Sequence, residues 1–189
     1  FLQRFATGAA TAVTGCAIDH GGFVPFDPLS PPPKSKLILM VGAAKKHKNL
    51  QCALDAFGKA KLPAPWRLTI VTPGDDVRSS VEINIPDAVQ GRVEIHRGID
   101  DSALHKLYAD AAIVLMPSHY EGFGMPLLEG MQSGAICLAS TAPALIEVGK
   151  RAHVTHTDSR DGRGWMRALR TAVAAHEAGE WTPVHQAVN

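Results

Sequence analysis

Two carboxylates and two glycines in one short stretch are the residues of this chain best suited to chemistry. Glu121 and Glu129 are separated by seven residues, and Gly122 and Gly124 lie between them. Glycine lets the backbone adopt a positive φ and lets a ligand approach closely. Pro126 suits the first turn of a helix, whose free N–H groups attract an anion such as phosphate. The stretch therefore combines groups that bind hydroxyls with groups that bind phosphate.

The elements on either side of this stretch could hold a ligand loop in place. Residues 111–116 form a continuous apolar run, which predicts a buried strand, and a helical pattern follows from Pro126 to Ser133. A second apolar run covers residues 135–139. Strand, loop, helix and strand make a βαβ unit, and such units bind ligands at the carboxyl end of the first strand.

Glu129 has two interpretations from the helical pattern alone. Leu127, Leu128 and Met131 share the apolar face of the expected helix. Glu129 lies nearly opposite that face, where most charged residues are merely exposed. An exposed polar position and a ligand-binding carboxylate are therefore equally compatible with the pattern.

A second loop that follows a strand carries positive charge. Residues 36–42 are predicted as a strand because 37–41 are all apolar, as in a parallel sheet covered on both faces. Gly42 ends this strand, three lysines occupy residues 45–48, and Asn49 begins a helical pattern. Composition alone favours a solvated basic turn. Because both loops follow strands, a parallel sheet would place them along the same edge.

The remaining patterns alternate between strands and helices. Strands are predicted at 67–71, 93–96 and 153–156, and helices are expected to begin at Asp101 or Ser102, at Pro143, and at Ser159 or Asp161. This alternation predicts an α/β domain with a doubly wound, Rossmann-like parallel sheet. The domain is expected over residues 36–178, after a linker or interdomain segment at 1–35 and before a tail at 179–189.

Composition limits the partners and the location. The chain has 189 residues, of which 46% are hydrophobic and 20% charged, with a formal net charge of +1. This balance gives no global field that favours nucleic acid, and no apolar run approaches the ~20 residues that span a bilayer. Cys16, Cys52 and Cys137 are an odd number in apolar surroundings, which predicts reduced thiols and a cytoplasmic location. Because the first residue is Phe1, a processed or truncated chain is expected.

Two other kinds of site find little support. His153 and His156 form an H-x-x-H pair, but on a strand their rings would point to opposite faces. A nicotinamide dinucleotide site needs G-x-G-x-x-G after the first strand, and residues 42–47 lack that pattern. The sequence therefore predicts neither a metal site nor a dinucleotide cofactor.

Residues 121–134 resemble a known family signature. Their sequence, E-G-F-G-M-P-L-L-E-G-M-x-x-G, is similar to the E-x7-E motif of retaining nucleotide-sugar glycosyltransferases, in particular glycosyltransferase family 4. The resemblance extends over roughly residues 36–175. It implies the C-terminal, donor-binding half of a GT-B fold. The implied reaction transfers a sugar from a nucleotide-diphosphate sugar with retention at the anomeric carbon.

The resemblance implies roles for the residues of this motif. Glu129 would bind the ribose hydroxyls of the nucleotide, and Glu121 would contact hydroxyls of the donor sugar near the reacting carbon. The backbone N–H groups of Phe123, Gly124 and Met125 would hold the sugar or the diphosphate. No cofactor is implied besides the nucleotide sugar, which is a substrate.

The basic loop also gains a role from the resemblance. Lys48, with Gly42 before it, matches the lysine that meets the donor diphosphate and would act in catalysis. The family's arginine is absent, because Ala43 and His47 stand at its two usual places. The diphosphate would therefore lack one permanent positive charge, unless a neighbouring lysine or a protonated His47 compensates.

The expected partners follow from the same resemblance. The donor is a nucleotide sugar, whose base would contact the backbone of Gly98 and Ile99. The acceptor, a glycan or lipid-linked sugar, would bind mainly to an N-terminal half that this chain lacks, and any peripheral membrane contact would run through that half. Polysaccharide assembly is a common setting for the family. The alternative is a glycosyltransferase-like binding or structural module without turnover, which the missing arginine favours and the two intact glutamates oppose.

Overall fold

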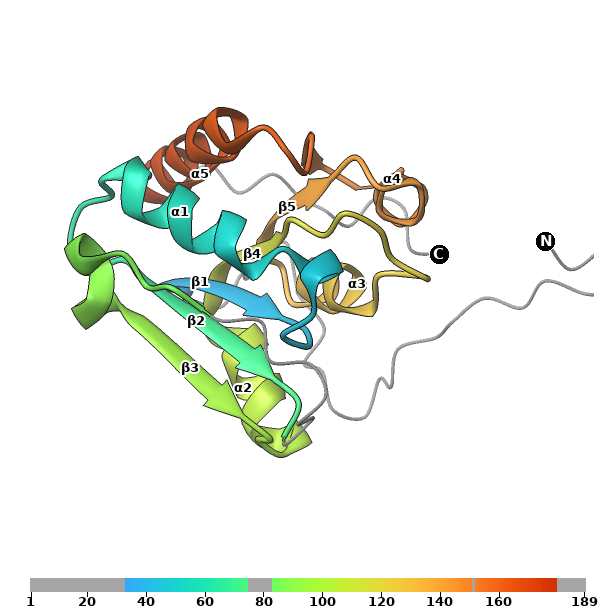
Figure 1. Ribbon diagram of the computed structural model, residues 1–189, viewed down its shortest axis with the longest axis horizontal. Coiled ribbons are helices and arrows are strands. Elements are labelled where there is room, and N and C mark those ends of the chain that lie inside the picture. The colour runs from blue at the N-terminus through green and yellow to red at the C-terminus, as the bar shows by residue number, and fades with distance from the viewer. Residues whose placement is uncertain (1–32, 75–82, 151, 180–189) are drawn as a thin grey trace, which may run out of the picture.

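The computed structural model describes residues 33–74, 83–150 and 152–179, which fold around one parallel sheet (Figure 1). The strands are β1 (Ser35–Val41), β2 (Arg67–Thr72), β3 (Val93–Arg97), β4 (Ala111–Met116), β5 (Ile136–Ser140) and β6 (Val154–Thr157). They lie in the order β3-β2-β1-β4-β5-β6, and each neighbouring pair is parallel. The predicted doubly wound α/β sheet is confirmed. Its order reverses between β1 and β4, where such sheets bind ligands.

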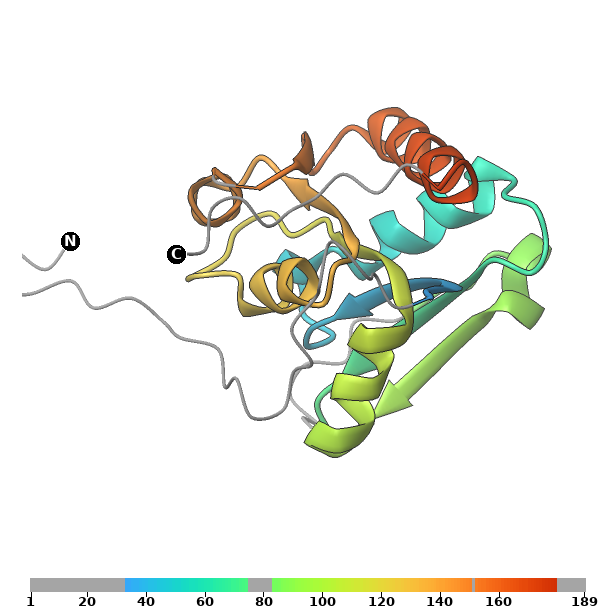
Figure 2. The ribbon, with the colours of Figure 1, turned by 180° about the vertical axis from the view of Figure 1, so that it is seen from behind.

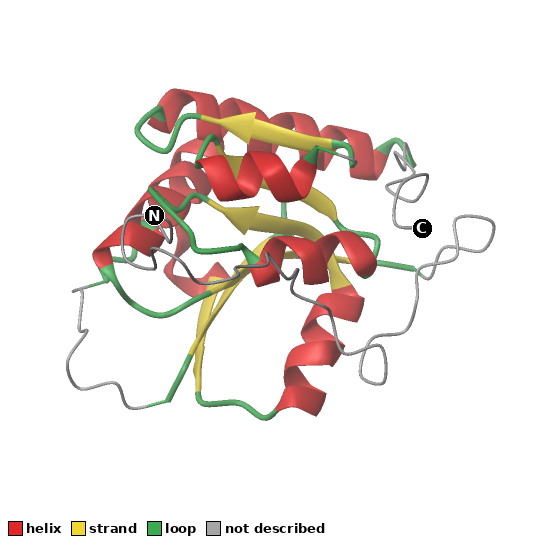
Figure 3. Cartoon of the chain, turned by 90° about the vertical axis from the view of Figure 1, so that its right-hand side faces the viewer, coloured by secondary structure: helices red, strands yellow, loops and turns green. Residues whose placement is uncertain are grey.

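Helices cover both faces of the sheet (Figures 2 and 3). One face carries α1 (Leu50–Ala60) and α5 (Gly162–Glu177), and the other carries α2 (Asp101–Asp110), α3 (Met125–Gln132) and α4 (Pro143–Gly149). Two short 3-10 turns, η2 (Lys46–Lys48) and η3 (Asp87–Arg92), precede α1 and β3. Over the described ranges, no helix combines the length and the apolar character that a bilayer span requires.

The side chains of β1 explain why its sequence is apolar throughout. Ile38 and Met40 pack against the layer of α1 and α5, whereas Leu37 and Leu39 pack against the layer of α2, α3 and α4. Successive side chains of a strand point to opposite faces, so a strand with helices on both sides needs apolar residues at every position. All six residues of β4 are buried for the same reason. The loops that follow β1 and β4 therefore start from fixed positions.

The cap of α2 differs from the prediction. Asp100, and not Asp101 or Ser102, precedes the helix, and its carboxylate accepts a hydrogen bond of 2.7 Å from the backbone N–H of Ala103. Asp100, Asp101 and Ser102 are all of types that cap helices well, so residue type alone does not locate the cap. The extended backbone at Asp100 identifies that residue as the cap. Of the two predicted starts for α5, Asp161 is the cap.

Several predictions concern residues outside the described ranges. The linker expected at 1–35 lies almost entirely there, as does the tail at 179–189, so both boundaries stay predictions. Cys16 lies there too, while Cys52 and Cys137 are free thiols.

Candidate functional site

An ion pair joins the loops that follow β1 and β4. Lys48 places its Nζ 2.8 Å from both carboxylate oxygens of Glu121. The exposed fractions of the Lys48 and Glu121 side chains are only 17% and 7%. Hydrogen bonds between charged groups are strong in such a mostly buried environment, because its dielectric constant is lower than that of water. Gly42 leaves room for the lysine stem, because a Cβ there would lie 3.3 Å from Lys48 Cδ. The two residues predicted to act in catalysis are thus in direct contact.

Asn49 and His119 fix the two loops around this pair. Asn49 Nδ2 donates to the backbone oxygens of Pro117 at 3.0 Å and of Ser159 at 2.8 Å. Asn49 has a φ of 56°, a left-handed conformation that asparagine tolerates better than most residues. The backbone N–H of His119 donates to the backbone oxygen of His47 at 2.7 Å. Three loops at the carboxyl edge of the sheet are therefore held together.

His47 stands at one of the places where an arginine is expected. Burial first, and then the positive charge of Lys48, lower the pKa of His47 below its usual value. The imidazole therefore adds little positive charge near neutral pH. Its ring stacks on that of Tyr120, with the centroids 4.6 Å apart and the planes inclined by 21°. In this state His47 does not replace the permanent charge of the missing arginine.

The N-terminus of α3 follows the same loop. Gly124 precedes the helix with a φ of 98°, and a Cβ there would lie 2.5 Å from Leu145 Cδ2. The backbone angle and the packing against α4 therefore both require glycine. Pro126 occupies the first turn, and the first N–H groups of a helix, from Met125 onward, point out of its end. Directly before Gly124, Phe123 is half-buried. This end of α3 suits an anion.

Glu129 lies one turn into α3 and contacts α2. It is half-buried, whereas Tyr108 on α2 is fully buried. Burial raises the pKa of Tyr108 well above its usual value, and the nearby negative charge of Glu129 raises it further. The phenol therefore stays protonated and lies near the carboxylate of Glu129. Of the two interpretations of Glu129, that of a merely exposed side chain does not fit this contact.

Gly98 and Ile99 follow β3 at the same edge of the sheet. Gly98 has a φ of 58°, and its N–H donates to the backbone oxygen of Thr72 at 3.0 Å. A Cβ at Gly98 would lie 3.1 Å from the Cα of Gly74, so glycine allows the loops after β2 and β3 to approach. Ile99 packs, half-buried, against the layer of α2, α3 and α4. Ile99 and Glu129 therefore lie on the same side of the sheet.

Comparison with known proteins decides the family. Residues 26–164 match the family described as glycosyl transferases group 1. The chain belongs to this family. It is 31% identical over 127 residues to the MMP alpha-(1->4)-mannosyltransferase of Mycolicibacterium hassiacum, a match that covers 65% of this chain and 30% of that enzyme. This group 1 glycosyltransferase chain thus spans about a third of the length of the curated relatives it matches.

Solved structures show the same fold. The sucrose-phosphate synthase of Thermosynechococcus elongatus gives a TM-score of 0.72 at 23% identity, over 95% of this chain and 48% of that structure. The C-terminal domain of a glycosyl transferase group 1 family protein from Francisella tularensis gives a TM-score of 0.66 at 20% identity, over 81% of this chain and 82% of that domain. The fold of this glycosyltransferase chain is therefore that of the C-terminal half of a GT-B protein.

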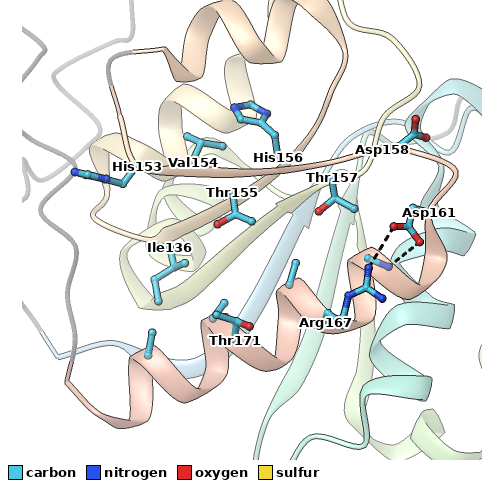
Figure 4. Close-up of a pocket in the computed structure, with 14 residues that line it drawn as sticks. Ile136, His153, Val154, Thr155, His156, Thr157, Asp158, Asp161, Arg167 and Thr171 are labelled. Carbon is cyan, nitrogen blue, oxygen red and sulfur yellow. Dashed lines mark hydrogen bonds and ion pairs between the residues drawn. The ribbon is translucent and has the colours of Figure 1, made fainter.

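The glycosyltransferase domain has a further concave surface between β6 and α5, with a volume of about 650 Å³ (Figure 4). Thr155 and Thr157 point from β6 toward α5, whereas His156 points away and places its Nδ1 3.0 Å from the backbone oxygen of Ser140. His153 precedes the strand and diverges from His156. No group of three His, Cys, Asp or Glu side chains in the described ranges could hold a metal ion. None of the predicted site residues lines this groove.

Three residues that contact or neighbour the predicted site residues could not be identified from the sequence. The pattern places Asn49 at a helix start and Tyr108 in the core, and it gives Tyr120 no role. The hydrogen bonds of Asn49 reach across 68 and 110 residues of sequence, so no local spacing reports them. The one available signal is that asparagine is favoured where a left-handed backbone begins a helix.

Proposed function

We propose that this chain is the donor-binding half of a retaining glycosyltransferase. The reaction would transfer a sugar from a nucleotide-diphosphate sugar to a glycan or lipid-linked acceptor, which binds mainly to another half of the protein. The proposal rests on the contact between Lys48 and Glu121 in the loop that leads into α3. This arrangement joins a cation, a carboxylate and an anion-binding helix end at the carboxyl edge of a doubly wound sheet.

Lys48 would stabilise the diphosphate as it leaves. An ammonium group has three N–H donors, and Glu121 engages Lys48 through two carboxylate oxygens, which leaves capacity for a phosphate oxygen. Negative charge grows on the diphosphate as its bond to the sugar breaks, and a cation already in place stabilises that charge. Because Ala43 and His47 add no permanent charge, more of this task falls on Lys48 and the N–H groups at the start of α3.

The two glutamates would hold hydroxyls of the donor. A carboxylate accepts two hydroxyl hydrogen bonds, and such charge-assisted bonds are about twice as strong as neutral ones. Glu121 would bind the donor sugar, and Glu129, whose carboxylate lies near Tyr108, would bind the ribose. The base would contact the backbone of Gly98 and Ile99, on the side of the sheet that carries Glu129.

Sugar transfer by the full-length protein tests this proposal. We expect one of UDP-, GDP- or ADP-sugars to act as donor, and Glu121→Gln to lower kcat at least about 100-fold because a charge in the site is lost. Glu94→Gln is the matched control, since Glu94 is exposed on β3. The anomeric configuration of the product, read by NMR, tests retention. Inversion, or full activity of Glu121→Gln, would refute the proposed mechanism.

A module that binds donors without turnover is the second candidate. Ala43 and His47 support it, because the arginine expected at those places is absent. It predicts that the full-length protein binds a nucleotide sugar and neither transfers nor hydrolyses it. Turnover that Glu121→Gln abolishes would exclude this candidate.

A further inference from the structure

Tyr120 is an exposed aromatic residue in the loop that follows β4. Its exposed fraction is 63%, and the one other exposed large hydrophobic side chain among the described residues, Ile146, reaches only 39%. Leaving a phenol ring in water forfeits the free energy of burying it. Tyr120 directly precedes Glu121, and its ring stacks on His47, the residue before Lys48, so the ring belongs to the same pair of loops as the ion pair.

The ring of Tyr120 is held in place before any ligand binds. One of its faces stacks on His47, with the centroids 4.6 Å apart and the planes inclined by 21°. The backbone of the neighbouring His119 donates to the backbone oxygen of His47 at 2.7 Å, which ties the two loops together. Lys48 and Glu121, the next residues in each loop, are joined by their ion pair. A ring fixed in this way loses little conformational entropy when a ligand packs on it.

The contacts of this loop point away from the region assigned to the nucleoside. His119 places its Nδ1 2.9 Å from Ser159 Oγ, and Ser159 lies just before α5. The helices α1 and α5 cover one face of the sheet, whereas Ile99 and Glu129 lie with α2 and α3 on the other. If the ribose binds at Glu129 and the base at Ile99, the ring of Tyr120 is available to the sugar that binds near Glu121.

We propose that Tyr120, supported by His47, is a stacking platform for a pyranose ring and a determinant of sugar specificity. A pyranose has a face of C–H groups, and the negative face of an aromatic ring attracts such positively polarised hydrogens. Glu121, next in sequence, would accept hydrogen bonds from the hydroxyls at the edge of the same sugar. This inference rests on the proposed function of the site. The pyranose has two sources, the sugar of the donor or the acceptor saccharide.

Calorimetric and NMR titrations of this chain distinguish the two sources. The donor arm compares UDP with UDP-glucose and GDP with GDP-mannose, and the acceptor arm uses methyl α-glucopyranoside and methyl α-mannopyranoside. We expect Tyr120→Ala to weaken the sugar-bearing ligand of one arm about threefold to tenfold, the usual worth of an aromatic contact. Affinity for the bare nucleotide should stay within about twofold, because the proposal assigns the ring to the sugar and not to the nucleoside.

Two variants separate stacking from a structural role. Tyr120→Phe keeps the aromatic ring and should keep the affinity for the sugar. His47→Ala removes the ring that supports Tyr120 and should lower the affinity for the sugar in part. Thermal unfolding should be unchanged in Tyr120→Ala, since the ring is exposed. Equal affinities of the parent and Tyr120→Ala for every sugar-bearing probe overturn this inference. Loss of bare-nucleotide binding in the parent chain would instead count against the proposed function.

Discussion

Asn49 donates a hydrogen bond of 2.8 Å from Nδ2 to the backbone oxygen of Ser159, across 110 residues of sequence. The same amide also donates to the backbone oxygen of Pro117 at 3.0 Å. Lys48 directly precedes Asn49 in the sequence. One side chain therefore sets the spacing of the loops that frame the ion pair. We predict that Asn49→Ala lowers the free energy of unfolding by about 2–3 kcal/mol, from two lost hydrogen bonds and a left-handed backbone that alanine disfavours. Urea unfolding followed by circular dichroism measures this change.

Two glycine variants divide that effect into its parts. Asn49→Gly keeps the left-handed backbone at low cost and should lose only the hydrogen bonds, about 1–2 kcal/mol. Lys61, which ends α1 with a φ of 50°, is the control position. Lys61→Gly should be neutral or stabilising. Equal losses for Asn49→Ala and Asn49→Gly would contradict a role for the backbone angle, and no loss in either would contradict the role of the amide.

The ion pair of Lys48 and Glu121 should matter for stability as well as for ligands. Lys48→Met leaves the carboxylate of Glu121, which is 7% exposed, without its partner. Breaking one side of a buried pair costs about 3 kcal/mol or more, and we expect that order of loss in urea unfolding. Lys59→Met is the matched control, because Lys59 and Asp55 lie 3.7 Å apart with exposed fractions of 70% and 45%. Its change should stay within about 0.5 kcal/mol. Equal effects of the two substitutions would contradict this account.

Tyr108 should act on nucleotide affinity through Glu129. Tyr108→Phe keeps the buried ring and removes the hydroxyl near the Glu129 carboxylate, which we predict donates to that carboxylate when a nucleotide is bound. Because a hydrogen bond to a charged group contributes about 1.5 kcal/mol, we expect about tenfold weaker nucleotide binding by calorimetry. A double variant with Glu129→Ala should be no weaker than Glu129→Ala alone. Independent, additive losses would show that Tyr108 acts by another route.

His47 should make nucleotide binding depend on pH. Burial and Lys48 lower its pKa in the free protein, and a bound diphosphate would raise that pKa by adding negative charge. Binding would then take up a proton, so affinity should rise as pH falls from about 7.5 toward 5.5 and level off below the pKa of the free protein. His47→Gln should remove this slope. A slope of the opposite sign, or an unchanged slope in His47→Gln, would contradict this prediction.

The strands and their loops could be predicted because local pattern carries them. β1 and β4 are apolar at every position since helices cover both faces of the sheet, and parallel strands place their following loops at one edge. That rule brought the loops of Lys48 and Glu121 together, although the pattern could not show that the two side chains touch. Glycine at 124 was predictable for its backbone, and its packing on Leu145 was not.

The contacts that complete the site depend on tertiary packing. Tyr108 belongs to the core by its spacing, and only the approach of α2 to α3 brings its hydroxyl to Glu129. The stacking of His47 on Tyr120 joins two loops that no sequence pattern pairs. The cap of α2 went to Asp100 because backbone conformation, and not residue type, selects among neighbouring candidates.

Calorimetric titration with UDP, GDP and ADP tests the central claim most directly. The chain, its Glu129→Ala variant and the control Glu94→Ala would be compared at one pH and salt concentration. We predict that one nucleotide binds, that Glu129→Ala weakens it at least about tenfold through the lost ribose contacts, and that Glu94→Ala leaves it unchanged. Binding that is indifferent to Glu129→Ala, or no nucleotide binding by this chain, would contradict a donor site at the end of β4 and the start of α3.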